Sequence, residues 1–138
     1  MKKRILAIDY GGKRCGIAVT DELQLIASPL TTVDTQELFP FLTKYFHTEA
    51  VETLLVGEPK RFDGSDSQIA AAINQFIAKF QQEFPDIAVV RIDERFSSKM
   101  AFQTMIDSGI SKQKRRDKGT VDKIAAAIIL QDYLHYRK

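Results

Sequence analysis

The chain has 138 residues, the length of one globular domain, and we expect a single domain over residues 1–138. Its 44% hydrophobic and 28% charged residues exclude a disordered chain, and no apolar run approaches the roughly 20 residues that a membrane span needs. The single cysteine, Cys15, cannot form an intramolecular disulfide, so we expect a cytoplasmic protein without a membrane partner.

Charge is distributed unevenly along the chain. Residues 1–110 carry 12 Lys and Arg against 15 Asp and Glu, whereas residues 111–138 carry 8 against 3. The excess is concentrated in residues 112–118, here called the basic segment, which contains Lys112, Lys114, Arg115, Arg116 and Lys118. Such a cluster is typical of a surface that binds phosphates, although a solvated loop has the same composition.

The first third of the chain predicts three strands that form a meander. Short apolar runs predict strands over residues 4–9 and 15–20, separated by a turn at Gly11 and Gly12. This connection is too short for a crossover, so the two strands pair antiparallel. A third strand over residues 25–33 contains Pro29, which favours an edge position in the sheet.

The apolar spacing then alternates between helical and strand-like. It predicts a helix over residues 35–46, capped by Asp34 or Thr35, and a strand over residues 53–56. A helix of about 18 residues follows, with an apolar stripe from Ile69 to Phe80, and then a strand over residues 87–92. Two helices complete the chain, one from Ser97 or Ser98 to near Gly109 and one over residues 121–136, capped by Thr120.

This order of elements predicts an α/β fold built on a mixed five-stranded sheet. The two strand–helix units imply right-handed crossovers and make strands one, four and five parallel. With the meander on one side, the expected strand order is 3-2-1-4-5, flanked by helices.

Acidic residues mark the ends of these elements. Asp9 ends the first strand, Asp93 and Glu94 follow the fifth, and Asp122 lies in the first turn of the expected last helix. Ligand sites in such sheets lie beyond the carboxyl ends of the parallel strands. Each acid alone is equally typical of a turn or a helix start. The small residues at 125–127 would let the last helix lie close to the sheet and bring Asp122 towards the strand ends.

Carboxylates that converge from separate elements repel one another unless a cation holds them. Mg²⁺ and Mn²⁺ prefer oxygen ligands, and two such ions can activate water and stabilise the leaving oxygen in phosphodiester hydrolysis. The basic segment beside them would supply a grip on a nucleic-acid backbone that does not depend on sequence. Acids for metal and bases for phosphate together favour a nuclease.

Four segments, in order, resemble the signature segments of the YqgF family: DYGGKRCGIAV at 9–19, GEPKRFDGS at 57–65, DERFSS at 93–98 and KGTVDKIAAAIIL at 118–130. These bacterial proteins are called Holliday-junction-resolvase-like and are described as pre-16S rRNA nucleases. The resemblance spans nearly the whole chain. It implies a ribonuclease-H-like fold and a metal-dependent endonuclease that processes the 5′ end of precursor 16S rRNA in ribosome biogenesis.

The resemblance also implies that Asp9, Glu94 and Asp122 are the catalytic, metal-binding acids. Neighbouring residues of a strand face opposite ways, so only one of Asp93 and Glu94 would face the metal. We choose Glu94 because its longer side chain can reach from just past the strand end.

Basic residues in four places are candidates for binding the RNA backbone. They are Lys13 and Arg14, Lys60 and Arg61, Arg95, and the basic segment, with Lys112, Lys114, Arg115, Arg116 and Lys118. The alternative is solvation for Lys13, Arg14 and the basic segment, and an ion pair with a neighbouring acid for Arg95.

Two other functions remain open. One is a resolvase that cleaves four-way DNA junctions, which would need a dimer, and we expect a monomer or a weak homodimer. The other is a non-catalytic RNA-binding module that assists ribosome assembly or associates with ribosomal or transcription proteins.

Overall fold

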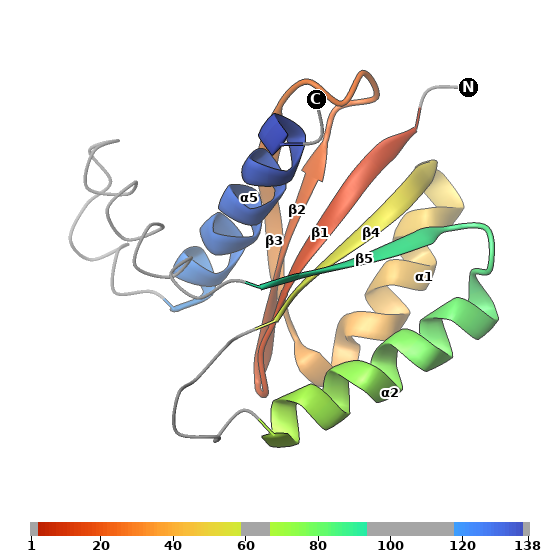
Figure 1. Ribbon diagram of the computed structural model, residues 1–138, viewed down its shortest axis with the longest axis vertical. Coiled ribbons are helices and arrows are strands. Elements are labelled where there is room, and N and C mark those ends of the chain that lie inside the picture. The colour runs from red at the N-terminus through yellow and green to blue at the C-terminus, as the bar shows by residue number, and fades with distance from the viewer. Residues whose placement is uncertain (1–2, 59–66, 94–117, 137–138) are drawn as a thin grey trace.

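The computed structural model describes residues 3–58, 67–93 and 118–136 (Figure 1). The expected helix that ends near Gly109 lies outside these residues. Within the described ranges the strands and helices follow the predicted alternation. In chain order they are β1 (Arg4–Tyr10), β2 (Arg14–Thr20), β3 (Ala27–Asp34), η1 (Thr35–Glu37), α1 (Leu38–Thr48), β4 (Val51–Glu58), α2 (Ser67–Glu83), β5 (Ala88–Asp93) and α5 (Lys118–Tyr136).

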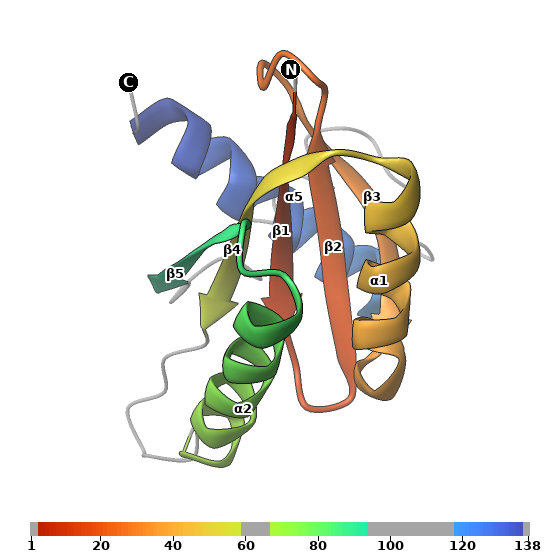
Figure 2. The same cartoon turned by 90° about the vertical axis from the view of Figure 1, so that its right-hand side faces the viewer.

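The five strands form one mixed sheet in the order β3-β2-β1-β4-β5, as the sequence predicts. β2 pairs antiparallel with β1 and with β3, whereas β4 lies parallel to both β1 and β5. The strand that contains Pro29 is therefore an edge strand, as expected. Helices α1 and α2 cover one face of the sheet and α5 lies across the other (Figures 1 and 2).

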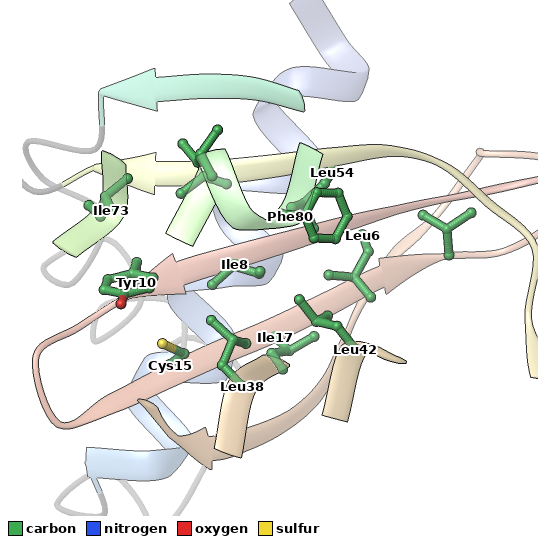
Figure 3. Close-up of a cluster of buried hydrophobic side chains, with 13 residues drawn as sticks. Leu6, Ile8, Tyr10, Cys15, Ile17, Leu38, Leu42, Leu54, Ile73 and Phe80 are labelled. Atoms are coloured by element: carbon green, nitrogen blue, oxygen red, sulfur yellow. The ribbon is translucent and has the colours of Figure 1, made fainter. Parts of the chain in front are cut away.

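Strand β1 is buried on both faces, which explains its unbroken apolar sequence. Leu6, Ile8 and Tyr10 pack with α1 and α2 in the larger core cluster (Figure 3). Ile5 and Ala7 pack with α5 in the smaller cluster on the opposite face. Because side chains alternate along a strand, this pattern assigns a face to every residue of β1.

Aromatic rings pack α1 and α2 against each other on their face of the sheet. Phe80 is fully buried, and its ring contacts those of Phe46, Phe76 and Phe84 at centroid distances of 5.9, 6.0 and 5.0 Å. Full burial of one such side chain contributes about 1.5–3 kcal/mol. Phe80 lies beside Leu6 and Leu54, and Tyr10 lies at the carboxyl end of β1, so the larger cluster extends along the length of β1 (Figure 3). No helix in the described ranges is both long and apolar enough to cross a membrane.

The start of α1 differs from the prediction. A 3₁₀ turn occupies Thr35–Glu37, and the α-helix begins at Leu38. The Asp34 side chain makes no capping hydrogen bond. The Thr35 hydroxyl donates instead to the carbonyl of Gly11 at 2.7 Å, which ties the β3–α1 connection to the β1–β2 turn.

The start of β3 also differs, because the preceding loop is organised by a side chain. The Asp21 carboxylate accepts hydrogen bonds from the N–H groups of Leu23, Leu25 and Ile26 at 3.3, 2.8 and 2.9 Å. Residues 25 and 26 therefore belong to the hairpin loop, and the strand begins at Ala27.

Helix α5 begins three residues earlier than predicted, at Lys118. Thr120 is thus inside the helix and is not its cap, and Asp122 lies in the second turn, not the first. Gly119 has a low helix propensity but lies inside α5, which packs across β1, β2 and β3. Ala125 and Ala126 are fully buried, as the proposed close approach requires.

Candidate functional site

Asp9 lies near the carboxyl end of β1, on the face of the sheet that α5 covers. It follows Ile5 and Ala7 in the alternation, and it is half-buried. Its direct partners on the neighbouring strands are Gly16 in β2 and Gly57 in β4. Residues paired across strands share a face, so the positions on both sides of Asp9 carry no side chain.

Asp122 reaches the same place from α5. A β-carbon added at Gly16 would overlap the backbone carbonyl of Asp122 and would lie 2.7 Å from the amide nitrogen of Lys123. Helix and strand backbones are therefore in direct contact at the strand position that pairs with Asp9. A glycine inside a strand commonly marks such a close approach. The acids from β1 and α5 thus flank one residue, Gly16.

The side chain of Arg14 joins the two elements. Its Nε donates to Oδ2 of Asp122 at 2.9 Å, and the side chains are 35% and 23% exposed. Arg14 is the first residue of β2, two positions before Gly16, and it therefore shares the α5 face of the sheet. A half-buried charge-assisted hydrogen bond fixes the orientation of the Asp122 carboxylate.

The charges of Asp9 and Asp122 both affect the pKa of the Cys15 thiol. Burial is the main cause that raises its pKa, and the negative charges of Asp9 and Asp122 raise the pKa further. Hydrogen bonds with the Gly11 backbone and with Thr35 act in the opposite direction. Two carboxylates acting on one neighbouring group is consistent with their convergence at this end of β2.

The third expected acid is not described. Glu94 lies outside the described residues, whereas Asp93 is the last residue of β5, where its backbone pairs with that of Glu58. Within residues 3–58, 67–93 and 118–136, no group of three or more His, Cys, Asp and Glu side chains is placed to hold a metal ion. The described part of the chain contributes two carboxylates to the site.

The donors that are present fit a hard divalent cation. Both are carboxylates, they come from separate elements, and neither is exposed enough to be a freely solvated surface acid. Oxygen donors of this kind are the preferred ligands of Mg²⁺ and Mn²⁺. Arg14 supplies one positive charge against the two negative charges of Asp9 and Asp122.

The residues that were expected to bind phosphate lie in different surroundings, and most of them are outside the described residues. Lys13 is exposed in the β1–β2 turn. Arg14 is in β2 and forms an ion pair with Asp122, whereas the sequence analysis expected either a phosphate contact or a solvated turn there. Lys118 begins α5, and its side chain is not described. The others, which are Lys60, Arg61, Arg95, Lys112, Lys114, Arg115 and Arg116, lie outside the described residues.

Two features of the site escaped the sequence analysis. The glycines that flank Asp9 were not singled out, although a glycine inside the apolar run CGIAV was a usable signal for a close approach. The pairing of Arg14 with Asp122 had no such signal, because 108 positions separate the two residues.

Comparisons with known proteins extend over nearly the whole chain. A family model described as "RuvX: Holliday junction resolvase" matches residues 3–136. A protein of Flavobacterium johnsoniae named "Putative pre-16S rRNA nuclease" is 58% identical over 135 residues, which cover 98% of each chain. A protein of the same name from Flavobacterium psychrophilum is 58% identical over 131 residues, covering 95% of this chain and 96% of its own.

Among solved structures, YeaZ from Pseudomonas aeruginosa matches 78% of this chain and 50% of its own, with a TM-score of 0.42 and 20% identity.

Proposed function

Because this chain belongs to the RuvX family, the YqgF proteins, and has their ribonuclease-H-like fold, we propose that it is a metal-dependent endonuclease. The reaction would be hydrolysis of phosphodiester bonds near the 5′ end of precursor 16S rRNA, in the cytoplasm, during ribosome biogenesis. The names of the 58% identical relatives support the rRNA substrate.

One observation carries the proposal: Asp9 pairs across the sheet with Gly16, and the backbone of Asp122 lies against that same glycine. Two half-buried carboxylates from distant parts of the chain are thereby brought to the carboxyl end of the parallel strands. Ligand sites in open α/β sheets lie at this edge.

The alternation of β5 supports Glu94 as the third acid. Val90 and Ile92 pack in the cluster on the α5 face, so every second residue of this strand belongs to that face. The next position of this alternation in the sequence is that of Glu94, which lies outside the described residues, and we propose Glu94 as the third acid on this ground and on the resemblance.

Asp9, Glu94 and Asp122 would hold Mg²⁺ or Mn²⁺. When bound between carboxylates, such ions activate water and stabilise the leaving oxygen of a phosphodiester. The three acids would then orient the ions, and the core beneath β1 keeps Asp9 fixed. Lys13 and the basic segment, with Lys60, Arg61 and Arg95, would hold the RNA backbone beside the acids.

The direct test is cleavage of a precursor 16S rRNA fragment by the purified protein, with Mg²⁺, with Mn²⁺ and with EDTA. We expect cleavage only with a divalent ion, and a loss of at least about 100-fold in Asp9→Asn and Asp122→Asn proteins. Asp132→Asn is the matched control, because Asp132 is an exposed acid of the same helix. Cleavage retained by Asp122→Asn protein would contradict the proposal.

A second substrate is favoured by the description of the matched family. Resolvases cleave four-way DNA junctions, and the same three acids would serve that reaction. Offering the same protein a four-way junction and the rRNA fragment in parallel separates the two substrates. Binding of RNA without cleavage under every metal condition would indicate an assembly factor without nuclease activity.

A further inference from the structure

Arg14 forms an ion pair with Asp122, whose carboxylate would bind the metal ion in the proposed function. Nε of Arg14 donates to Oδ2 of Asp122 at 2.9 Å, so this oxygen already has a partner. The two residues are held at this separation by the backbone contact of α5 with Gly16. The pair is therefore built into the docking of the helix and is not a chance encounter of two surface side chains.

A cation that approaches Asp122 meets two obstacles. The guanidinium blocks one carboxylate oxygen, and its positive charge repels a second cation nearby. A divalent ion carries twice the charge of the guanidinium. Partly exposed ion pairs of this kind contribute little net stability, so such an ion can compete for the oxygen.

Resting on the proposed function, we propose that Arg14 is an internal counter-ion of Asp122, which a divalent cation displaces, and that the released guanidinium then binds a phosphate of the nucleic-acid backbone. In the metal-free protein Arg14 neutralises Asp122 and holds its carboxylate in position. In the metal-loaded protein Arg14 is turned towards the substrate.

The chemistry of arginine suits both positions. Its guanidinium stays charged at every working pH, and its planar set of donors matches a phosphate as well as a carboxylate. With 35% of its side chain exposed, Arg14 can move towards solvent without opening the core. The neighbouring residue Lys13 is exposed in the turn, and among the described interactions it forms no ion pair with Asp122.

The consequence is a coupling between metal and nucleic acid. A metal ion that frees Arg14 raises the affinity for the backbone, and the bound backbone, by retaining Arg14, raises the affinity for the metal by the same factor. The nuclease would then hold its ions weakly until substrate is present.

Calorimetric titration with Mn²⁺ tests the first step without any measurement of activity. Replacing Arg14 removes the competitor, so we expect Arg14→Gln to bind Mn²⁺ about fivefold or more tightly than the wild type. Lys13→Gln removes the same charge one position away and should change the affinity by less than about twofold. Arg14→Met, which keeps the aliphatic stem, provides the measurement if Arg14→Gln does not fold. Unchanged or weaker Mn²⁺ binding by a folded Arg14 variant would overturn the proposal.

A double-mutant cycle separates contact from general charge. In an Asp122→Asn background the competitor has no carboxylate to occupy, so Arg14→Gln should leave Mn²⁺ affinity within about twofold. An equal gain in both backgrounds would mean that Arg14 acts only through its charge, and would refute the counter-ion role. If Asp122→Asn and wild type bind Mn²⁺ equally, the proposed metal site itself fails, which is a different result.

Fluorescence anisotropy of an RNA fragment tests the second step. Ca²⁺ is a convenient probe, because it takes the same class of oxygen ligands. We expect Ca²⁺ to raise RNA affinity in the wild type by a factor that is at least about threefold larger than in Arg14→Gln protein. Equal factors in the two proteins would show that Arg14 is not released to the backbone.

Discussion

The backbone carbonyl of Asp122 lies against the Cα of Gly16, so closely that no β-carbon fits between them. Helix α5 can reach β2 at this depth only because position 16 has no side chain. Asp9 is the cross-strand partner of Gly16. One glycine therefore sets the distance between two acids that lie 113 positions apart in the sequence.

Gly16→Ala should move the start of α5 away from the sheet. The added methyl group would meet backbone atoms, which cannot rotate away, and we expect a loss of about 1–3 kcal/mol in the free energy of unfolding. Urea denaturation measures this change. Gly12→Ala is the control, since its β-carbon would meet only the flexible Cδ1 end of Ile69 at 3.2 Å. Similar losses in both proteins would show that the contact at Gly16 has no special role.

The thiol of Cys15 should be inert in the folded protein. It is fully buried on the face covered by α1 and α2, and burial together with the charges of Asp9 and Asp122 raises its pKa (Figure 3). Alkylation needs the thiolate, so the reaction should be at least about 100-fold slower at pH 8 in buffer than in 8 M urea. Iodoacetamide labelling followed by mass spectrometry measures both rates. Rapid labelling of the native protein would contradict this packing.

Asp21 should make the β2–β3 hairpin loop sensitive to acid. Hydrogen bonds from the backbone, with that of Ile26 first, lower the pKa of this carboxyl below 3.8. A lowered pKa in the folded state means that the ionised group stabilises the loop above about pH 3.8, and that this contribution is lost as pH falls through the folded pKa.

Amide hydrogen exchange of Leu25 and Ile26 reports this loss directly, once it is corrected for the intrinsic effect of pH. Protection of both amides should fall in the wild type as pH drops through the lowered pKa of Asp21, and should be weak at every pH in Asp21→Ala protein. Glu22→Gln should leave the pattern of the wild type unchanged. If Asp21→Ala protein keeps its protection, the carboxylate does not organise the loop.

The basic segment should contribute to affinity for nucleic acid through charge alone. Replacing Lys114, Arg115 and Arg116 by Gln should weaken RNA binding regardless of sequence, and should flatten the dependence of log affinity on log salt by about 0.7 per lost contact with a single strand. Anisotropy titrations over about a fourfold range of salt, from about 50 to about 200 mM, suffice for this test. An unchanged salt dependence would assign the segment to solvent.

The fold was predictable because short apolar runs and turn residues mark its strands clearly in the sequence. A strand buried on both faces, a tight glycine turn and an edge proline determine the order of the meander, and the crossover rule determines the rest. The approach of Asp9 and Asp122 followed from strand ends and small residues. These signals are local, and each belongs to one element.

What escaped prediction depends on contacts between distant elements. The predicted start of α5 was three residues late, because the helix continues back through Gly119 to Lys118 despite the low helix propensity of glycine. The predicted start of β3 was two residues early, because the Asp21 carboxylate accepts hydrogen bonds from the backbone N–H groups of Leu25 and Ile26 and holds them in the loop. The pairing of Arg14 with Asp122 was not predicted, because the two residues lie 108 positions apart in the sequence. Glu94 as the third acid stays a prediction.

A structure of the protein crystallised with Mn²⁺ tests the central claim most directly, since the anomalous signal of Mn²⁺ locates the ion independently of its ligands. We predict an ion within about 2.1–2.3 Å of carboxylate oxygens of Asp9, Glu94 and Asp122, with Arg14 turned away from Asp122. An ion bound elsewhere, or Asp122 still paired with Arg14 at saturating Mn²⁺, would contradict the account.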